Sequence, residues 1–252
     1  MNAENGGNGL ESAKRVNGGL PGRGECYAQR LRRFVDEVTV YPVSCERLAA
    51  GRSDEQWLDA VLLGGARIVQ LRDKESSDRR LLAKARYFRQ RTLDAGALFM
   101  VNDRVDIALL ADADGVHLGQ QDLPPEEIGR LAPEMLIGIS CNSEEQAREL
   151  GRQEQAGTTV VSYFNIGPLF PTRTKEGLAE FIGPEAIARF SAYITAPFTV
   201  MGGIKLEHVP QLVDRGARRI ALVTALSQAP DIAAETARWV QAIAMAGRKH
   251  HE

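Results

Sequence analysis

Residues 100–123 read MVNDRVDIALLADADGVHLGQQDL. Apolar runs at 98–101 and 116–118 predict two short buried strands, and the pattern between them, with Val105, Ile107, Ala108 and Leu109 as its apolar positions, predicts a helix. The strands of such a unit run parallel, so their carboxyl ends lie side by side. Asp103 and Asp122 follow these ends and should meet at one edge of the sheet. Two converging carboxylates suggest a divalent-cation site.

The same alternation of strand and helix continues on both sides of this unit. Helical patterns such as 54–63, 77–95 and 143–155 separate the apolar runs. Eight strands that alternate with helices predict an α/β protein, a (β/α)₈ TIM barrel. A doubly wound sheet is the main alternative, but it usually stops at about five or six parallel strands. The predicted strands are 38–43, 67–71, 98–101, 116–118, 135–140, 158–164, 198–201 and 219–223.

One barrel accounts for most of the chain. Residues 1–24 are rich in Gly, Asn and Ser, which predicts a disordered extension. The barrel is expected over 25–247, preceded by a short helix at 27–35 that covers its bottom, and 248–252 form a tail. No linker or shift in composition divides 36–246, which indicates a single domain.

Composition excludes several classes of function. The 252 residues carry a net charge of −2, which argues against a generic binder of nucleic acid or membrane surfaces. The start lacks the order of a signal peptide, and no apolar run approaches the roughly 18 residues of a membrane span. Three cysteines without CxxC spacing are expected to be reduced thiols. We expect a cytoplasmic protein that acts on small molecules, and a homo-oligomer is compatible with the sequence.

Polar residues gather where the predicted strands end, which is where the chemistry of such barrels takes place. Gly202 and Gly203 follow the seventh strand and Thr224 the eighth, and these two loops commonly hold a phosphate through backbone N–H groups. The alternative is that the glycines only form a tight turn. The other candidates at strand ends are Gln70, Arg72, Asp73, Lys74, Asn102, Gln120, Ser140, Thr172, Arg173, Thr174 and Lys175, with His117 inside the fourth strand.

Three cations, Arg72, Lys74 and Lys175, fall on the face that carries the two aspartates. Mg²⁺ typically binds one or two carboxylates and completes its shell with water and substrate phosphate. Asp103 and Asp122 together with a diphosphate would satisfy that requirement, and the basic residues would bind the remaining phosphate charge. The alternative for each aspartate is helix capping, because each precedes a helical pattern.

Other chemistries have little support in the sequence. It contains no HExxH, GxSxG or GxxxxGK[ST] motif, and no GxGxxG after a strand. His117 is expected to pack or to line a substrate site rather than to bind a metal. Cys141 lies beside Ser140, but nothing places a base next to it, which argues against a nucleophile.

Seven motifs give the chain a specific resemblance. In order and approximate spacing, the region 36–246 resembles the thiamine phosphate synthase family. The motifs are VQLRDK (69–74), VNDRVDIAL (101–109), ADGVHLGQQD (113–122), IGIS (137–140), GPLFPTRTK (167–175), GGI (202–204) and VTALSQA (223–229).

The resemblance implies a (β/α)₈ barrel that joins 4-amino-2-methyl-5-hydroxymethylpyrimidine diphosphate to 4-methyl-5-(2-phosphoethyl)thiazole. The products are thiamine monophosphate and pyrophosphate. Asp103 and Asp122 would carry Mg²⁺. Arg72, Lys74, Ser140 and Lys175 would act in catalysis. The pyrimidine diphosphate would be bound by Gln70, Leu71, Arg72, Asp73, Lys74, Asn102, Ser140 and Lys175. The thiazole phosphate would be held by Thr172, Arg173, Thr174, Gly202, Gly203, Val223 and Thr224, with His117 as a further lining residue.

The chain departs from the family pattern in places. Asn142 stands where many relatives have histidine, and the segment after Lys175 lacks the usual proline-rich character, which bears on the expected lid. A thiazole tautomerase shares the barrel but lacks the metal aspartates and has a histidine in the fifth loop. An aldolase would need a Schiff-base lysine on a strand, and the predicted strands have none. A non-catalytic sensor of a phosphorylated ligand would not need the metal pair.

Overall fold

A computed structural model of the chain describes residues 25–172 and 181–248, and eight parallel strands form its centre. Neighbouring strands pair in the order β1-β8-β7-β6-β5-β4-β3-β2. A parallel bridge between Val43 and Gln70 joins the two ends of this order, so the sheet closes into a barrel. The predicted fold is confirmed. The strands are β1 (Val40–Pro42), β2 (Ile68–Leu71), β3 (Leu98–Asn102), β4 (Gly115–Leu118), β5 (Leu136–Cys141), β6 (Tyr163–Ile166), β7 (Phe198–Val200) and β8 (Ile220–Leu222).

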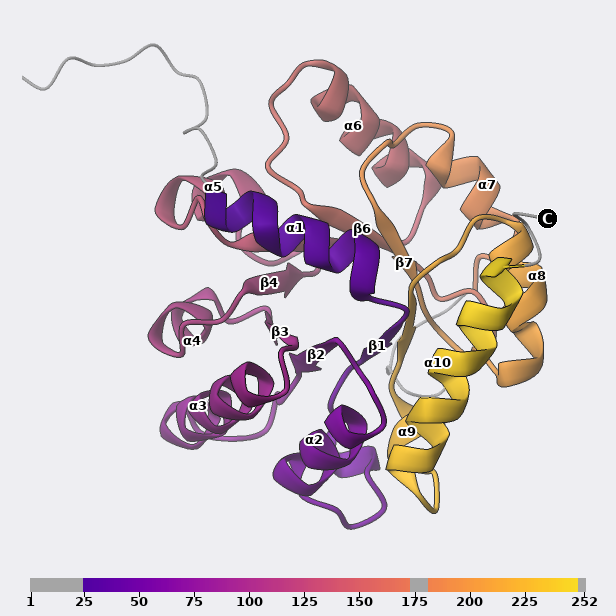
Figure 1. Cartoon of the computed structure of the whole chain (residues 1–252). Helices are drawn as coiled ribbons and strands as arrows, with labels where there is room; N and C mark the ends of the chain where they lie inside the picture. Colours follow the sequence, from indigo (N-terminus) through magenta and orange to yellow (C-terminus); the bar gives the residue numbers. More distant parts are fainter. Residues whose placement is uncertain (1–24, 173–180, 249–252) are drawn as a thin grey trace, which may run out of the picture.

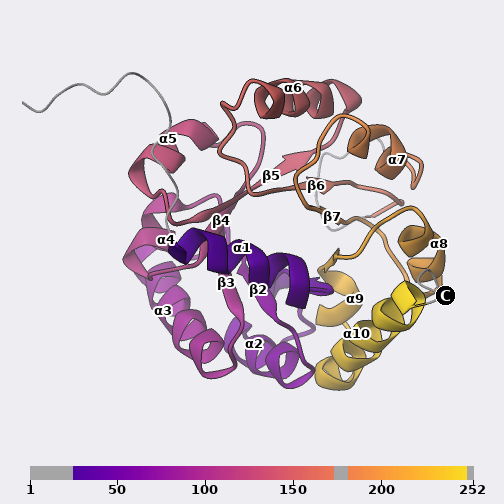
Figure 2. The ribbon, with the colours of Figure 1, turned by 45° about the horizontal axis from the view of Figure 1, so that its top comes forward.

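Helices alternate with the strands and surround the barrel (Figures 1 and 2). Among the described helices, none combines the length and apolar character that crossing a membrane requires. The helices are α1 (Glu25–Glu37), α2 (Asp54–Leu63), α3 (Asp78–Asp94), α4 (Val105–Leu110), α5 (Pro125–Leu131), α6 (Glu144–Gln155), α7 (Ala186–Ser191), α8 (Val209–Asp214), α9 (Thr224–Ser227) and α10 (Ile232–Arg248), with 3₁₀ turns η1 (Glu46–Leu48) and η2 (Leu206–His208).

Helix α1 covers the amino-terminal end of the barrel, as the sequence predicted (Figure 1). Its Phe34 is fully buried and packs on Tyr163 inside the barrel, with ring centroids 4.5 Å apart. Arg219 donates to the backbone oxygens of Phe34 and Val35 at 2.8 and 2.6 Å. Burial lowers the pKa of Arg219 to about 10. With this end closed, the carboxyl ends of the strands remain for a site.

Side chains alternate between the inside and the outside of the barrel along every strand, as the pleat requires. On β2, Ile68 packs in the interior cluster with Leu98 and Leu136, whereas Val69 and Leu71 pack against the surrounding helices. The same alternation, continued past the strand ends, determines which loop residues reach the site.

Strand β6 differs most from its prediction. The run TTVV at 158–161 is β-branched and suggested a strand over 158–164, but the paired strand is Tyr163–Ile166. Ser162 instead bonds the start of β5, accepting from the Ile137 N–H at 2.9 Å and donating its own N–H to the Ile137 oxygen at 2.7 Å. Asn165, expected in a loop, is therefore a barrel residue. Residues 1–24 and 249–252 lie outside the described residues.

Candidate active site

A cavity of about 600 Å³ opens at the carboxyl ends of the strands. Its walls come from the segments after all eight strands, so residues far apart in sequence meet there. Most of the described residues that were predicted for the site line it: Gln70, Arg72, Lys74, Asn102, Asp103, His117, Asp122, Ser140, Thr172, Gly202, Gly203, Val223 and Thr224.

Two predicted residues lie elsewhere. Leu71 is 1% exposed and packs between the sheet and the helices. Asp73 turns the same way, toward Lys84 on α3. Alternation along β2 explains both positions. Gln70 and Arg72 point into the barrel, whereas Leu71 and Asp73 point outward. The side chains of Leu71 and Asp73 therefore face away from the cavity, which does not support the predicted contact of either with substrate. The predicted Arg173, Thr174 and Lys175 lie outside the described residues.

Asp103 and Asp122 meet at one side of the cavity and are called the acid pair below. Lys74 Nζ lies 3.1 Å from Asp103 Oδ2. Burial raises the pKa of Asp122, and the hydrogen bond and negative charge of Asp103 raise it further. A bound cation would relieve the repulsion between two carboxylates held together in this way. Asp103 also has a φ of +61°, a region that favours glycine, and such strain is often found at functional sites.

Helix capping does not explain the acid pair. Helix α4 has Arg104 at its N-cap and α5 has Pro124, and neither position has a side-chain cap bond. The Asp122 carboxylate instead accepts from the Gly119 N–H at 2.5 Å, which closes the loop after β4. Asp103 donates its backbone N–H to the His117 oxygen at 2.9 Å, which links the ends of β3 and β4. The backbone of Asp103 and the carboxylate of Asp122 are thus both fixed beside the cavity.

A chain of hydrogen bonds crosses the barrel below the cavity. Gln70 Nε2 donates to the Tyr41 hydroxyl at 2.9 Å, and this hydroxyl lies 2.9 Å from that of Tyr163. His117 continues the chain, with Nδ1 3.0 Å from the Tyr163 hydroxyl and Nε2 3.1 Å from Ser140 Oγ. Burial raises the pKa of both tyrosines, so their hydroxyls stay neutral. This floor chain orients Gln70 and Ser140 toward the cavity.

The turn at Gly202 and Gly203 forms the opposite wall. Both have positive φ, 96° and 62°, a backbone conformation that residues with a side chain rarely adopt. A Cβ on Gly203 would lie 2.4 Å from the Pro171 oxygen, and one on Gly202 would lie 2.4 Å from Pro168 Cβ. Phe170 donates its N–H to the Gly202 oxygen at 3.0 Å, so the loop after β6 lies directly on this turn. Glycine is required here by packing as well as by φ.

Cys141 ends β5, and its buried side chain packs between the sheet and the helices rather than in the cavity. Burial raises the pKa of its thiol to about 12, so it is not a thiolate nucleophile at neutral pH. This agrees with the sequence argument against such a role.

The sequence did not single out several polar residues at or just below the cavity. Tyr41, Asn165 and Thr199 line the cavity, and Tyr163 lies directly below it in the floor chain. Thr199 donates its hydroxyl hydrogen to Asn165 Oδ1 at 2.7 Å, a buried bond between β6 and β7. The signal was the spacing of two between Tyr163 and Asn165, which places both inside the barrel once the strand limits are known.

A sequence model of a family described as thiamine monophosphate synthase matches residues 40–226. The chain belongs to the thiamine monophosphate synthase family. The match runs from β1 to α9 and includes the acid pair, the floor chain and the glycine turn.

Relatives of this family cover most of the chain. It is 38% identical over 200 residues to the thiamine-phosphate synthase of Pelotomaculum thermopropionicum, covering 79% of this chain and 89% of that protein. Identity to the enzyme of the same name from a Roseiflexus species is 39% over 198 residues, covering 78% and 81%. The structure of thiamine phosphate pyrophosphorylase from Pyrococcus furiosus matches with a TM-score of 0.74 at 31% identity, covering 84% and 98%. A 3-hexulose-6-phosphate synthase at 15% identity, TM-score 0.58, shares the fold alone.

Proposed function

We propose that this chain is a thiamine phosphate synthase. It joins 4-amino-2-methyl-5-hydroxymethylpyrimidine diphosphate to 4-methyl-5-(2-phosphoethyl)thiazole and releases pyrophosphate. The observation that carries the proposal is the layout of one cavity, with the acid pair, Lys74 and Arg72 on one side and the glycine turn on the other. Two anionic substrates can therefore bind at opposite walls of one cavity, with their reacting ends facing each other in the space between the walls. Such an enzyme of small charged metabolites would work in the cytoplasm.

The acid pair fits Mg²⁺. Asp103 and Asp122 offer carboxylate oxygens from the ends of adjacent strands, and the pKa of Asp122 is raised by its burial and by the neighbouring Asp103. Mg²⁺ prefers oxygen ligands and commonly uses one or two carboxylates plus phosphate oxygens. When bound, the ion would supply positive charge next to the departing diphosphate.

The basic side chains near the acid pair would bind the diphosphate charge that Mg²⁺ does not neutralise. Arg72 and Lys74 line the same wall as the acid pair. Lys175 would complete the group. Gln70 and Asn102 would contact the pyrimidine ring, and Ser140, whose hydroxyl lies 3.1 Å from His117 Nε2, would contact the diphosphate. The thiazole phosphate would bind at Gly202, Gly203, Val223 and Thr224, with Thr172, Arg173 and Thr174 from the loop after β6.

The chemistry requires charge stabilisation and positioning more than proton transfer. The bond between the pyrimidine methylene carbon and the diphosphate oxygen breaks, and its electron pair leaves with the diphosphate. The electron-rich aminopyrimidine stabilises the cationic carbon until the thiazole nitrogen donates its lone pair and forms the new C–N bond. Arg72, Lys74 and Lys175 stabilise the leaving charge. The glycine turn holds the thiazole close to the carbon.

A thiazole tautomerase is the nearest alternative function on this barrel. The acid pair and Asn142 favour the synthase, because Asp103 and Asp122 converge in the cavity and Asn142 lines it without an imidazole. A non-catalytic sensor would not require a second carboxylate, Asp122, beside Asp103 with its strained backbone.

The proposal is tested by incubating the purified chain with both precursors and Mg²⁺ and separating the products by chromatography. We expect thiamine monophosphate only when both precursors are present. Its absence under conditions in which the Pelotomaculum thermopropionicum relative forms it would reject the proposal.

Thermal unfolding tests the cation site. The folded-state pKa of Asp122 lies above its ordinary value, so the ionised acid pair costs the folded state stability as pH rises through that range. At pH 7, Asp122→Asn is therefore expected to raise the Tm of the metal-free protein. MgCl₂ with inorganic pyrophosphate should raise the Tm of the unsubstituted chain, and of Asp122→Asn much less. An equal shift in both proteins would place the cation elsewhere.

A further inference from the structure

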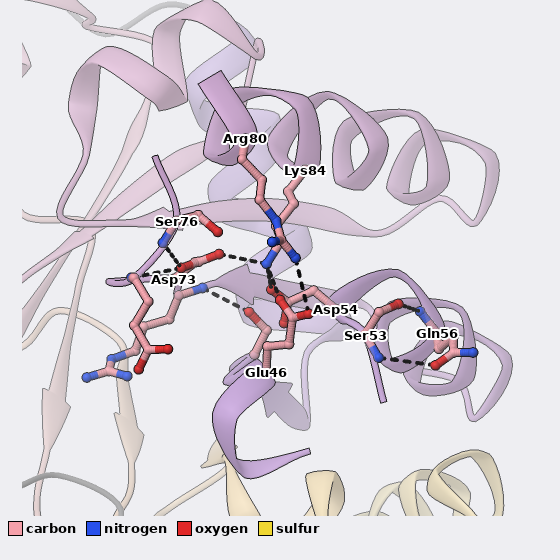
Figure 3. A network of polar contacts seen from close by, with 11 residues as sticks. Glu46, Ser53, Asp54, Gln56, Asp73, Ser76, Arg80 and Lys84 are labelled. Carbon is pink, nitrogen blue, oxygen red and sulfur yellow. Dashed lines mark hydrogen bonds and ion pairs between the residues drawn. The ribbon is translucent and has the colours of Figure 1, made fainter. Parts of the chain in front are cut away.

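Lys84 lies in the middle of α3 with its ammonium group inside the protein. Its side chain is only 3% exposed. Nζ lies 2.7 Å from Asp54 Oδ2 and 2.7 Å from Asp73 Oδ2, and it also contacts Glu46. Figure 3 shows the three carboxylates converging on this nitrogen from η1, the start of α2 and the loop after β2. Lysine is almost never buried unless it is paired in this way.

The cluster carries more negative than positive charge. Burial lowers the pKa of Lys84, but the hydrogen bonds that its ammonium donates to the three carboxylates outweigh burial and raise the pKa above its ordinary value. Burial also raises the pKa of Asp54, whose Oδ1 has no hydrogen-bond partner among the described residues. A further cation, Arg80, lies 3.5 Å from Glu46 Oε1. A buried ion cluster of this kind is seldom a net source of stability, and its best-attested role is to fix geometry.

What the cluster fixes is the loop between β2 and α3. Asp73 uses one oxygen for Lys84, and its other oxygen, Oδ1, accepts from the N–H groups of Glu75 and Ser76 at 3.0 and 2.9 Å. The latter bonds form an Asx turn, which sets the path of the backbone. Lys84 thus holds the turn from outside the barrel.

The two residues beside Asp73 point the other way. Arg72 and Lys74 line the cavity, and Lys74 reaches Asp103 at 3.1 Å. The Arg72 N–H donates to the buried Ser44 hydroxyl at 3.0 Å, which fixes the first half of the loop. The second half depends on Asp73 and therefore on Lys84.

We propose that Lys84 is a positioning residue for the synthase reaction, acting through Asp73 to aim Lys74 at the diphosphate. The inference rests on the proposed function. Among the described residues, Glu46, Asp54 and Asp73 are the one set of three whose carboxylates are close enough to hold a metal ion. The lysine ammonium takes that central position, so a permanent internal cation orders the loop.

The test compares two carboxylates that Lys84 contacts equally closely. Asp73→Asn weakens the link between Lys84 and the loop but keeps an oxygen for the Asx turn. Asp54→Asn is the matched control, because it also removes one negative charge next to Lys84, but on the side of α2. We expect Asp73→Asn to raise the KM for the pyrimidine diphosphate about tenfold, as loss of a supporting contact typically does. The KM for the thiazole phosphate, bound at the opposite wall, should stay unchanged, and Asp54→Asn should change neither.

Binding of inorganic pyrophosphate with Mg²⁺, measured by calorimetry, separates this inference from the proposed function. Asp73→Asn should weaken that binding about tenfold and Asp54→Asn should not, whether or not thiamine monophosphate is formed. Equal effects of the two substitutions, or a parallel rise in KM for both substrates with Asp73→Asn, would overturn the positioning role. Lys84→Met, in a preparation that circular dichroism shows to be folded, should weaken pyrophosphate binding as Asp73→Asn does.

Discussion

Replacing Asp103 by alanine is expected to lower kcat for thiamine monophosphate formation by at least roughly 10²–10³-fold, the effect of losing one strong electrostatic contact to a transition state. Asp103 faces Asp122 and Lys74 at the cavity wall, so the substitution removes half of the acid pair. The fold should persist, because Asp103 lies at the rim of the barrel. Steady-state kinetics with both substrates saturating measures the effect.

Asp112 provides the matched control for this substitution. It is also a non-glycine residue with positive φ, 53°, but it is exposed after α4 and does not line the cavity. Asp112→Ala therefore imposes a similar backbone cost without touching the acid pair. A near-normal rate for Asp103→Ala would contradict the site assignment, as would an equal loss of rate in Asp112→Ala.

Gly138→Ala is expected to destabilise the barrel by about 3 kcal/mol, the upper part of the usual range for overpacking. Gly138 lies on β5, and a Cβ there would come within 2.1 Å of Tyr163 Cζ and 2.4 Å of its hydroxyl oxygen. Tyr163 cannot move aside easily, because it packs on Phe34 and bonds Tyr41 and His117. Thermal unfolding should show a Tm lower by roughly 6–12 °C.

A second substitution shows whether the clash is the cause. In a Tyr163→Leu background the ring is gone, so adding Gly138→Ala should cost less than about 1 kcal/mol, and the double-mutant cycle should show strong coupling. Gly247 on α10 is the control, since a Cβ there meets nothing within 4 Å. Gly247→Ala should leave stability unchanged or raise it slightly. Additive effects at 138 and 163 would show that their contact is not what constrains β5.

The fold and much of the site could be predicted because barrel chemistry follows strand ends. Helix α2 begins and ends where its pattern predicted, and Asp103 and Asp122 converge because parallel neighbouring strands carry them. Ser143 caps α6, accepting from the Gln146 N–H at 3.3 Å. Gln146, however, returns its side chain to the Asn142 N–H rather than to that of Ser143, so the capping box is incomplete.

Other features depend on register, which short apolar runs do not reveal. One step along β2 separates Arg72, which reaches the cavity, from Asp73, which reaches Lys84. The family motif around 69–74 grouped both as substrate contacts. Likewise, the floor chain needs Tyr41 and Tyr163 from opposite parts of the chain, 122 residues apart. Only the closed barrel brings such residues together.

The most direct test is the stoichiometry of the products when the purified chain turns over both precursors with Mg²⁺. If one cavity joins the two substrates, thiamine monophosphate and pyrophosphate should appear in equal amounts, and omission of the thiazole phosphate should stop formation of both. Release of pyrophosphate without thiamine monophosphate, or no release with both precursors present, would contradict the assignment of the cavity as a site that couples diphosphate departure to thiazole attack.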